Sequence, residues 1–311
     1  MLSSQIEHLV KKGLQSGFLK SLTSTSINYN KYPLIFDYGP FTSNLFFYFR
    51  HEWIKSFVRN NCGRYNFLWL DSIDDNQINQ ISNMTIGWQT KISNNNNSQI
   101  LPLIFKHNNH IDDDYFCIKY INSYDNINLT QLVNERTCFW KKYFLKREKL
   151  ECISLNKNQF NINYRFSSNI ESYHLETIQT NNNNNNNTSL NILLNINHTL
   201  ITLLIDSEMK SLHPLLTTYQ IQIQSTLKTI ELCLYLSKLL TYKYHLRVFR
   251  LINNNNNKND FIPFHIELND DTLKNGLCYI WNRDTQLNEQ IHVKQVAKRL
   301  ADYFKALEDF M

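Results

Sequence analysis

The stretch that decides the fold of the C-terminal part is DDTLKNGLCYIWNRDTQLNEQIHVKQVAKRLADY, from Asp270 to Tyr303. Gly276 to Trp281 has the pattern of a β-hairpin, in which Gly276 supplies the positive φ that a tight turn needs. The next four residues, Asn282 to Thr285, are typical of a turn. Five apolar residues then recur at helical spacing and predict a closing helix with one buried face: Val293, Val296, Leu300, Phe304 and Leu307.

Working back from this stretch, the pattern predicts a strand at Tyr219 to Ile223, where apolar residues alternate with Gln. A helix follows from Thr226 to Tyr242, with its polar residues confined to one stripe. Two more strands are expected, at His245 to Leu251 and at Ile262 to Leu268. Residues 213–311 are therefore predicted to form a small α/β domain in which helices cover a sheet.

The first 212 residues read as a separate α+β domain. Gly39-Pro40 precedes a helix whose stripe of Phe46, Phe49, Trp53 and Phe57 faces a core. Short apolar runs between Asn66 and Tyr120 indicate antiparallel strands, and Leu129 to Lys149 reads as an amphipathic helix with a basic polar side. Three asparagine tracts, at residues 94–97, 181–187 and 253–257, are expected to be loops, the second of them close to a domain boundary.

Composition places the chain among globular proteins. Its 311 residues suit about two domains, 42% are hydrophobic, and the net charge of +5 is compatible with a polyanionic partner without requiring one. Six cysteines without CxxC pairs or zinc spacing predict a reducing compartment without structural disulfides. We expect no metal, since the cluster of His107, His110 and Asp112 to Asp114 is more typical of a solvated loop. No apolar run reaches the length that spans a bilayer, so no membrane contact is expected.

Several stretches of the sequence resemble a known family. DYGPFTSNLFFYFRHEW, at Asp37 to Trp53, resembles the first class II motif of glycyl-tRNA synthetases, and LTQLVNERTCFWKKYF followed by NINYRF resembles that family after its second motif. In the C-terminal part, TLKNG, NRDT and HPLLTTYQIQIQ resemble the anticodon-binding domain of these synthetases and the accessory subunits of mitochondrial DNA polymerase gamma. The resemblance implies a degenerate class II synthetase-like domain over residues 1–212 and an anticodon-binding-like domain over residues 213–311.

The same resemblance implies that catalysis is lost. Class II synthetases hold ATP through two arginines, because a guanidinium pairs with phosphate in a bidentate manner. Here Lys91 and Ser93 stand where the Arg and Glu of the second motif belong, and Asn195 and His198 replace the Gly and Arg of the third. We therefore expect no catalytic residue, no cofactor and no ATP-dependent activation.

Without catalysis, the family resemblance leaves a role as an accessory subunit of another enzyme. The resemblance implies a non-catalytic processivity subunit that binds the catalytic subunit of mitochondrial DNA polymerase, mainly through its C-terminal domain, and also primer-template DNA. It implies a mitochondrial location, in the matrix or nucleoid, and residues 1–22 are weakly like a transit peptide. Asp71 to Met84 is too short for the helical insertion through which vertebrate members dimerise, which favours a monomer. The alternatives are a degenerate glycyl-tRNA synthetase paralogue that binds tRNA or other RNA, and an active divergent synthetase.

Two sets of residues are candidates for binding. WKKYFLKREK, at Trp140 to Lys149, interleaves aromatic and basic residues, which suits a phosphate backbone but also an ordinary solvated helix face. The nucleic-acid candidates are Arg136, Lys141, Lys142, Lys146 and Arg147. The candidates for contact with the partner protein are Arg283, Lys294, Lys298 and Arg299.

Overall fold

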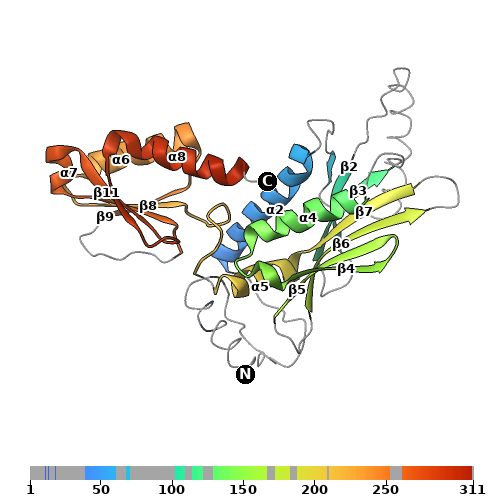
Figure 1. Ribbon diagram of the computed structural model, residues 1–311. Coiled ribbons are helices and arrows are strands. Elements are labelled where there is room, and N and C mark those ends of the chain that lie inside the picture. Colours follow the sequence, from blue (N-terminus) through green and yellow to red (C-terminus); the bar gives the residue numbers. More distant parts are fainter. Residues whose placement is uncertain are drawn as a thin grey trace, which may run out of the picture. The chain divides into compact units, whose positions relative to one another are not determined.

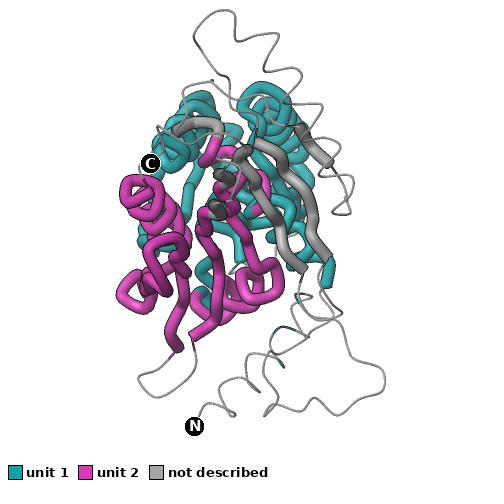
Figure 2. Tube along the Cα trace, turned by 90° about the vertical axis from the view of Figure 1, so that its right-hand side faces the viewer, with its two compact units in different colours: residues 1–29, 36–49, 207–311 teal, residues 30–35, 50–206 magenta. Residues whose placement is uncertain are grey.

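The computed structural model describes residues 11, 13, 18, 39–60, 68–70, 102–108, 114–121, 129–166, 172–182, 188–208, 210–252 and 261–309. The chain divides into two compact units (Figure 2). Residues 30–35 and 50–206 form the central unit, and residues 1–29, 36–49 and 207–311 form the C-terminal unit. The predicted boundary between residues 212 and 213 lies close to the passage at Asp206, whereas the N-terminal residues are divided between the units.

The central unit is built on a mixed sheet of seven strands in the order β1-β2-β3-β7-β6-β5-β4 (Figure 1). Only β1 and β2 pair in parallel, and the remaining neighbours are antiparallel. The antiparallel pairing of β2 with β3 confirms the strands predicted before Tyr120. The strands span Leu68–Leu70 (β1), Pro102–Asn108 (β2), Asp114–Ile121 (β3), Leu150–Asn156 (β4), Gln159–Arg165 (β5), Ser172–Asn182 (β6) and Thr188–Asn195 (β7).

Helices cover one face of this sheet. The second half of α2 (Pro40–Asn60) and α4 (Leu129–Tyr143) run side by side along it, and α5 (Ile196–Asp206) follows β7 directly (Figure 1). Trp53 and Phe57 of α2 are buried, as the helical stripe predicts. The opposing sheet residues are apolar as well, with Ile162, Ile178 and Ile192 fully buried. Burial of this shared face is the main source of stability for the unit.

The second asparagine tract differs from its prediction. β6 extends to Asn182, and both Asn181 and Asn182 pair with β7 residues. The tract therefore begins inside a strand and connects two neighbouring strands of one sheet, so it does not mark a domain boundary. Backbone pairing with β7 overrides the weak strand propensity of Asn, because the ladder satisfies the backbone polar groups on that side. The other two tracts lie outside the described residues.

The C-terminal unit contains a five-stranded sheet in the order β12-β11-β10-β8-β9. β8 is parallel to β9 and β10, and β10, β11 and β12 are antiparallel. α6 and α8 pack on the same sheet face and enclose a core that includes Ile223, Leu236 and Leu300. The elements are β8 (Ile221–Ser225), α6 (Ile230–Lys238), the π-helical turn η2 (Leu239–Lys243), β9 (Val248–Ile252), β10 (Phe264–Leu268), α7 (Asp270–Asn275), β11 (Leu277–Asn282), β12 (Asn288–His292) and α8 (Val293–Asp309).

Gly276 has the positive φ that the sequence predicts, at +73°, but its role is different. It ends the short helix α7, which begins with a capping box between Asn269 and Thr272. A left-handed residue after the last turn is a common way to end a helix. A Cβ atom at this position would lie 2.6 Å from the Nε2 atom of His292, so a larger residue would displace that ring in addition to straining the backbone. The hairpin turn lies after β11, at Arg283 to Thr285.

The two sheets and their helices confirm a mixed α and β protein of the α+β kind. The helix predicted from Leu129 to Lys149 is shorter than expected, since α4 ends at Tyr143 and a 3₁₀ turn, η1, spans Arg147–Lys149. Residues 144–149, called the basic segment below, are therefore not part of α4 and have a separate backbone conformation.

Candidate nucleic-acid interface

Arg136 does not lie on the surface, which corrects its prediction as a nucleic-acid contact. The residue is only 2% exposed, and its guanidinium group pairs with Glu176 of β6, with Nε at 3.0 Å from Oε1 and Nη2 at 3.3 Å from Oε2. Nη1 donates to Ser56 of α2. The rings of Phe57 and Phe139 lie against the guanidinium carbon, at 4.1 and 4.4 Å from their centroids. Arg136 therefore connects α2, α4 and β6.

Glu176 is the acceptor at the centre of this cluster. Besides Arg136, the indole N–H groups of Trp53 and Trp140 both donate to its carboxylate. A buried carboxylate is tolerated only where a counter-charge and hydrogen bonds compensate its desolvation. Four donated hydrogen bonds meet that requirement here.

A second buried carboxylate, Asp206, fixes the segment that follows α4. Its Oδ2 atom accepts a hydrogen bond from the backbone N–H of Leu145 at 2.5 Å, and Oδ1 accepts one from that of Lys146 at 3.2 Å. The hydroxyl of Tyr164 also donates to Oδ1, at 2.6 Å. Burial, together with the neighbouring Asp206 carboxylate, raises the pKa of Tyr164 well above its ordinary value. The backbone of the basic segment is thereby held by two strong charge-assisted hydrogen bonds.

The basic side chains around this segment differ in their access to solvent. Lys141 and Arg147 are exposed and Lys146 is half-buried, whereas the ammonium group of Lys142 is buried beside the ring of Tyr143, which does not suit its prediction as a nucleic-acid contact. Lys149 is engaged, because its Nζ donates to the carbonyl of Phe166. Lys141 and Arg147 thus present two cations on either side of a backbone that Asp206 anchors, and phosphate groups are the ligands that such cations favour.

Asn195 and His198, which stand in the place of the third motif, lie at a strand-to-helix junction, since β7 ends at Asn195 and α5 begins at Ile196. Asn195 is fully buried, and its Oδ1 atom caps the helix by accepting from the N–H of His198. The His198 ring lies 2.9 Å from the carbonyl of His174 and packs against Tyr173. Both residues serve the junction itself, and no arginine lies between residues 188 and 206. Lys91 and Ser93 lie outside the described residues.

Arg283 is also buried, which corrects its prediction as a contact to a partner protein. Its guanidinium donates to the carbonyls of Lys210, Leu212 and Phe261. Asp284 supplies the counter-charge at 2.6 Å. Arg283 therefore ties residues 210–212, where the chain re-enters the C-terminal unit, to the end of β11 and to Phe261 before β10.

The three predicted residues on α8 are accessible. Lys294, Lys298 and Arg299 are exposed, and Arg299 lies 3.6 Å from Glu289 in an ion pair that solvent screens strongly. Val296, Ala297 and Leu300 of the same helix are buried, so the amphipathic prediction for α8 is confirmed. The role of the three cations in partner binding stays a prediction.

Glu176 and Asp206 hold the elements around the candidate interface, and neither is among the candidates predicted from the sequence. The signal for Glu176 is a lone acid in the apolar strand sequence YHLETI, which indicates a buried and compensated carboxylate. Asp206 is the last residue of the apolar helix α5, where the negative end of the helix dipole disfavours a carboxylate. An acid placed against a local preference points to a specific partner, which here is the backbone after α4.

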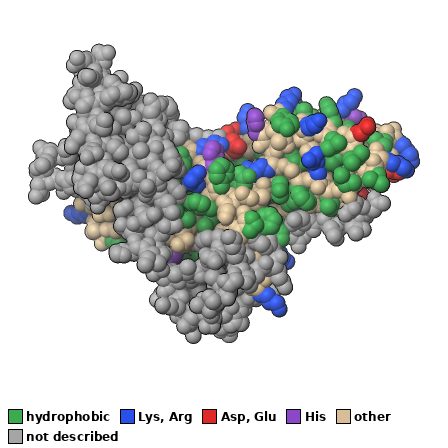
Figure 3. All heavy atoms as spheres, turned by 180° about the vertical axis from the view of Figure 1, so that it is seen from behind, with side chains coloured by type: hydrophobic (Ala, Val, Ile, Leu, Met, Phe, Trp, Pro, Cys, Tyr) green, Lys and Arg blue, Asp and Glu red, His purple; other side chains and the backbone are tan. Residues whose placement is uncertain are grey.

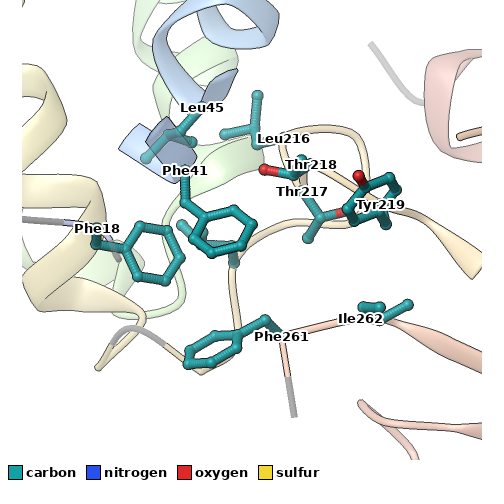
Figure 4. A pocket seen from close by; sticks show the side chains of 10 residues that line it. Phe18, Phe41, Leu45, Leu216, Thr217, Thr218, Tyr219, Phe261 and Ile262 are labelled. Atoms are coloured by element: carbon teal, nitrogen blue, oxygen red, sulfur yellow. The ribbon is translucent and has the colours of Figure 1, made fainter. Parts of the chain in front are cut away.

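The C-terminal unit also contains a small apolar cavity of about 110 Å³ (Figure 4). Rings of Phe18, Phe41 and Phe261 line it, and the carbonyl of Phe18 accepts from Gly39 and Thr42. Cofactor pockets usually exceed about 300 Å³ and contain several convergent polar groups. This cavity therefore suits an apolar group of side-chain size and not a cofactor.

The described residues contain no group of three or more potential metal ligands. None of the helices among them combines the length and apolar character needed to cross a membrane. Comparison of the chain with protein-family models and with curated proteins finds no match in either set.

Proposed function

We propose that the protein is a non-catalytic, nucleic-acid-binding accessory subunit of mitochondrial DNA polymerase. The observation that carries the nucleic-acid part is the pair of exposed cations, Lys141 and Arg147, flanking a backbone that buried Asp206 anchors. The polymerase partner and the mitochondrial location rest on the resemblance of the C-terminal segment to that family. Two units, one built on a largely antiparallel sheet and one on a mixed sheet, are compatible with the same proposal.

The absence of catalysis is part of the proposal. At the strand-to-helix junction the resemblance requires an arginine that grips ATP, and His198 occupies that position with its ring committed to the backbone of β6. An imidazole held in this way offers no bidentate grip for a phosphate. We expect purified protein to show no glycine-dependent exchange of pyrophosphate into ATP.

The nucleic-acid part is tested with the full chain and a primer-template duplex. Lys141→Glu combined with Arg147→Glu should lower affinity, and the slope of log K against log salt should fall by about 2, since each lost phosphate contact removes roughly 0.9. A matched control is Lys157→Glu, in the β4–β5 turn, which should leave that slope nearly unchanged. Equal effects of the two variants would refute a specific role for the segment.

The polymerase part is tested by purifying a tagged full-length copy from isolated mitochondria and identifying its companions by mass spectrometry. We expect the catalytic subunit of the DNA polymerase at near-equal amount. Recovery of the protein without any DNA polymerase would overturn this part.

An RNA-binding paralogue of glycyl-tRNA synthetase is the second candidate. The five-stranded sheet of the C-terminal unit, with its own buried core, is the observation that favours it, because the resemblance implies an anticodon-binding-like domain there. Competition between folded tRNA and primer-template DNA separates the two functions. Preference for tRNA at equal salt would favour the paralogue.

A further inference from the structure

Exposed tyrosines accompany basic residues on one helix of the C-terminal unit. Tyr235 of α6 is 65% exposed and Tyr242 of η2 is 77% exposed, values far above those of a tyrosine that supports a core. Lys238 lies between them, about one turn from each, and Lys243 follows; both are exposed. On the face of this unit seen in Figure 3, basic side chains are interspersed with hydrophobic ones.

The fold does not use these rings. The core side of the helix consists of Cys233, Leu236 and Leu240, which pack against the sheet. Tyr235 and Tyr242 point away from that core, and an aromatic ring that stays in contact with water contributes little burial free energy to the fold. The chain also forms a π-helical turn over Leu239–Lys243, a distortion that is common at functional sites.

We propose that Tyr235 and Tyr242, with Lys238 and Lys243, form a stacking site for single-stranded nucleic acid. Binding of single strands combines aromatic rings, on which bases stack, with cations that follow the backbone. The rings are seven residues apart, roughly 10 Å along a helix, so each would take a different base. The site belongs to the C-terminal unit and is separate from the basic segment after α4.

The charges around the rings agree with this ligand. Lys243 lies 5.4 Å from the ring centroid of Tyr244, where it adds positive charge beside an aromatic surface. Lys228 is paired with Asp270 and so contributes little net charge. Glu231, one turn before Tyr235, is the one exposed acid within α6. The net charge near the rings is therefore positive and suits any negatively charged partner. The exposed aromatic rings are what favour a nucleic acid over an acidic protein surface, because bases stack on them.

The alternative occupant is a protein, because Leu227 and Leu234 are exposed nearby. Substitutions at Tyr242 separate the two. A base requires an aromatic ring, so Tyr242→Phe should bind single strands within about twofold of wild type, and Tyr242→Ala should bind roughly tenfold or more weakly. Tyr242→Leu keeps an apolar surface but loses the ring, and it should behave like Ala.

The experiment uses the full chain and fluorescence anisotropy with labelled oligo-dT and oligo-U. Tyr279→Ala, an exposed tyrosine on a strand of the same unit, is the matched control and should change affinity by less than twofold. Lys238→Ala should lower the salt slope by about 0.7, the value for one phosphate contact on a single strand. Circular dichroism of each variant establishes that the fold is retained.

Three outcomes would overturn the proposal: no single-strand binding by wild type, no loss in Tyr242→Ala, or full binding by Tyr242→Leu. The last result would assign the surface to a protein partner. The duplex assay with Lys141 and Arg147 variants is independent of these tyrosines. Failure of the stacking site can therefore be distinguished from failure of the proposed function.

Discussion

At the scale of single residues, the buried ion pair of Arg136 and Glu176 gives the first prediction. Glu176→Gln removes the negative charge and leaves the guanidinium buried without a counter-ion. Breaking a buried pair in this way costs about 3–5 kcal/mol of unfolding free energy. Trp53 and Trp140 donate to the same carboxylate, so their fluorescence during urea unfolding provides the measurement.

The exposed pair of Arg165 and Glu151 is the matched control for that change. Its Nη2 and Oε1 atoms are 2.6 Å apart, but the Arg165 side chain is 50% exposed. Glu151→Gln should therefore cost no more than about 1 kcal/mol. Similar losses for the two variants would show that Glu176 is compensated by its indole donors and not by Arg136.

The raised pKa of Tyr164 predicts that the free energy of unfolding decreases at alkaline pH. Burial and Asp206 raise its pKa, so the folded state holds the phenol proton more tightly than the unfolded state does. Its stabilising contribution is complete below pH of about 10, the ordinary tyrosine value, and is lost as pH rises above it. Urea unfolding between pH 8 and 11 should show this decline, and Tyr164→Phe should be less stable at pH 8 but decline less steeply. Parallel curves for the two proteins would contradict the role of Tyr164.

At the scale of elements, Asp206 links α5 to the basic segment after α4. Asp206→Asn keeps the size of the side chain but removes its charge and replaces one of the two acceptor oxygens with an NH₂ donor, so one hydrogen bond to the backbone is lost and the other is weakened. We expect duplex affinity to fall several-fold while the salt slope stays unchanged, because Lys141 and Arg147 are still present. Salt titrations of the full chain measure both quantities. A reduced slope would indicate that Asp206 acts through the number of phosphate contacts and not through their position.

The elements themselves were largely predictable from sequence. In α8 one face is buried and the other solvated, and in α2 the buried residues Phe49, Trp53 and Phe57 recur at helical spacing, so apolar periodicity predicts both helices. The end of α4 at Tyr143 was not predictable, because the apolar and basic pattern continues to Lys149 while a tertiary contact to Asp206 breaks the helix.

The candidate site was predicted less well, for a physical reason. Arg136 and Lys141 lie in one amphipathic helix, and sequence alone does not reveal that Glu176, forty residues later, takes Arg136 into the core. Arg283 is similar, since its acceptors are carbonyl groups of Lys210 and Leu212. Long-range polar pairing leaves no periodic signal, so basic residues that satisfy buried acceptors look identical to basic residues that bind a ligand.

At the scale of the whole molecule, the division into two units predicts that part of the C-terminal unit folds alone. The buried core of its sheet is formed entirely by residues between Leu215 and Phe304. Arg283 also finds its acceptors within residues 210–284, so a fragment of residues 207–311 keeps this buried cation compensated. We expect that fragment to unfold cooperatively in urea, as domains of about 100 residues with their own core do.

The fragment should nevertheless be less stable than the same unit in the full chain. In the full chain the guanidinium of Arg247 lies 3.8 Å from the ring centroid of Tyr48, and Phe261 packs on Phe18; both partners are missing from the fragment. Contacts of this kind contribute on the order of 1 kcal/mol each. Tyr48→Ala in the full chain should reproduce part of the loss, and Phe304→Ala in the fragment, which opens the core, should abolish cooperative unfolding. A fragment without cooperative unfolding even before that substitution would mean that the N-terminal residues are required for this fold.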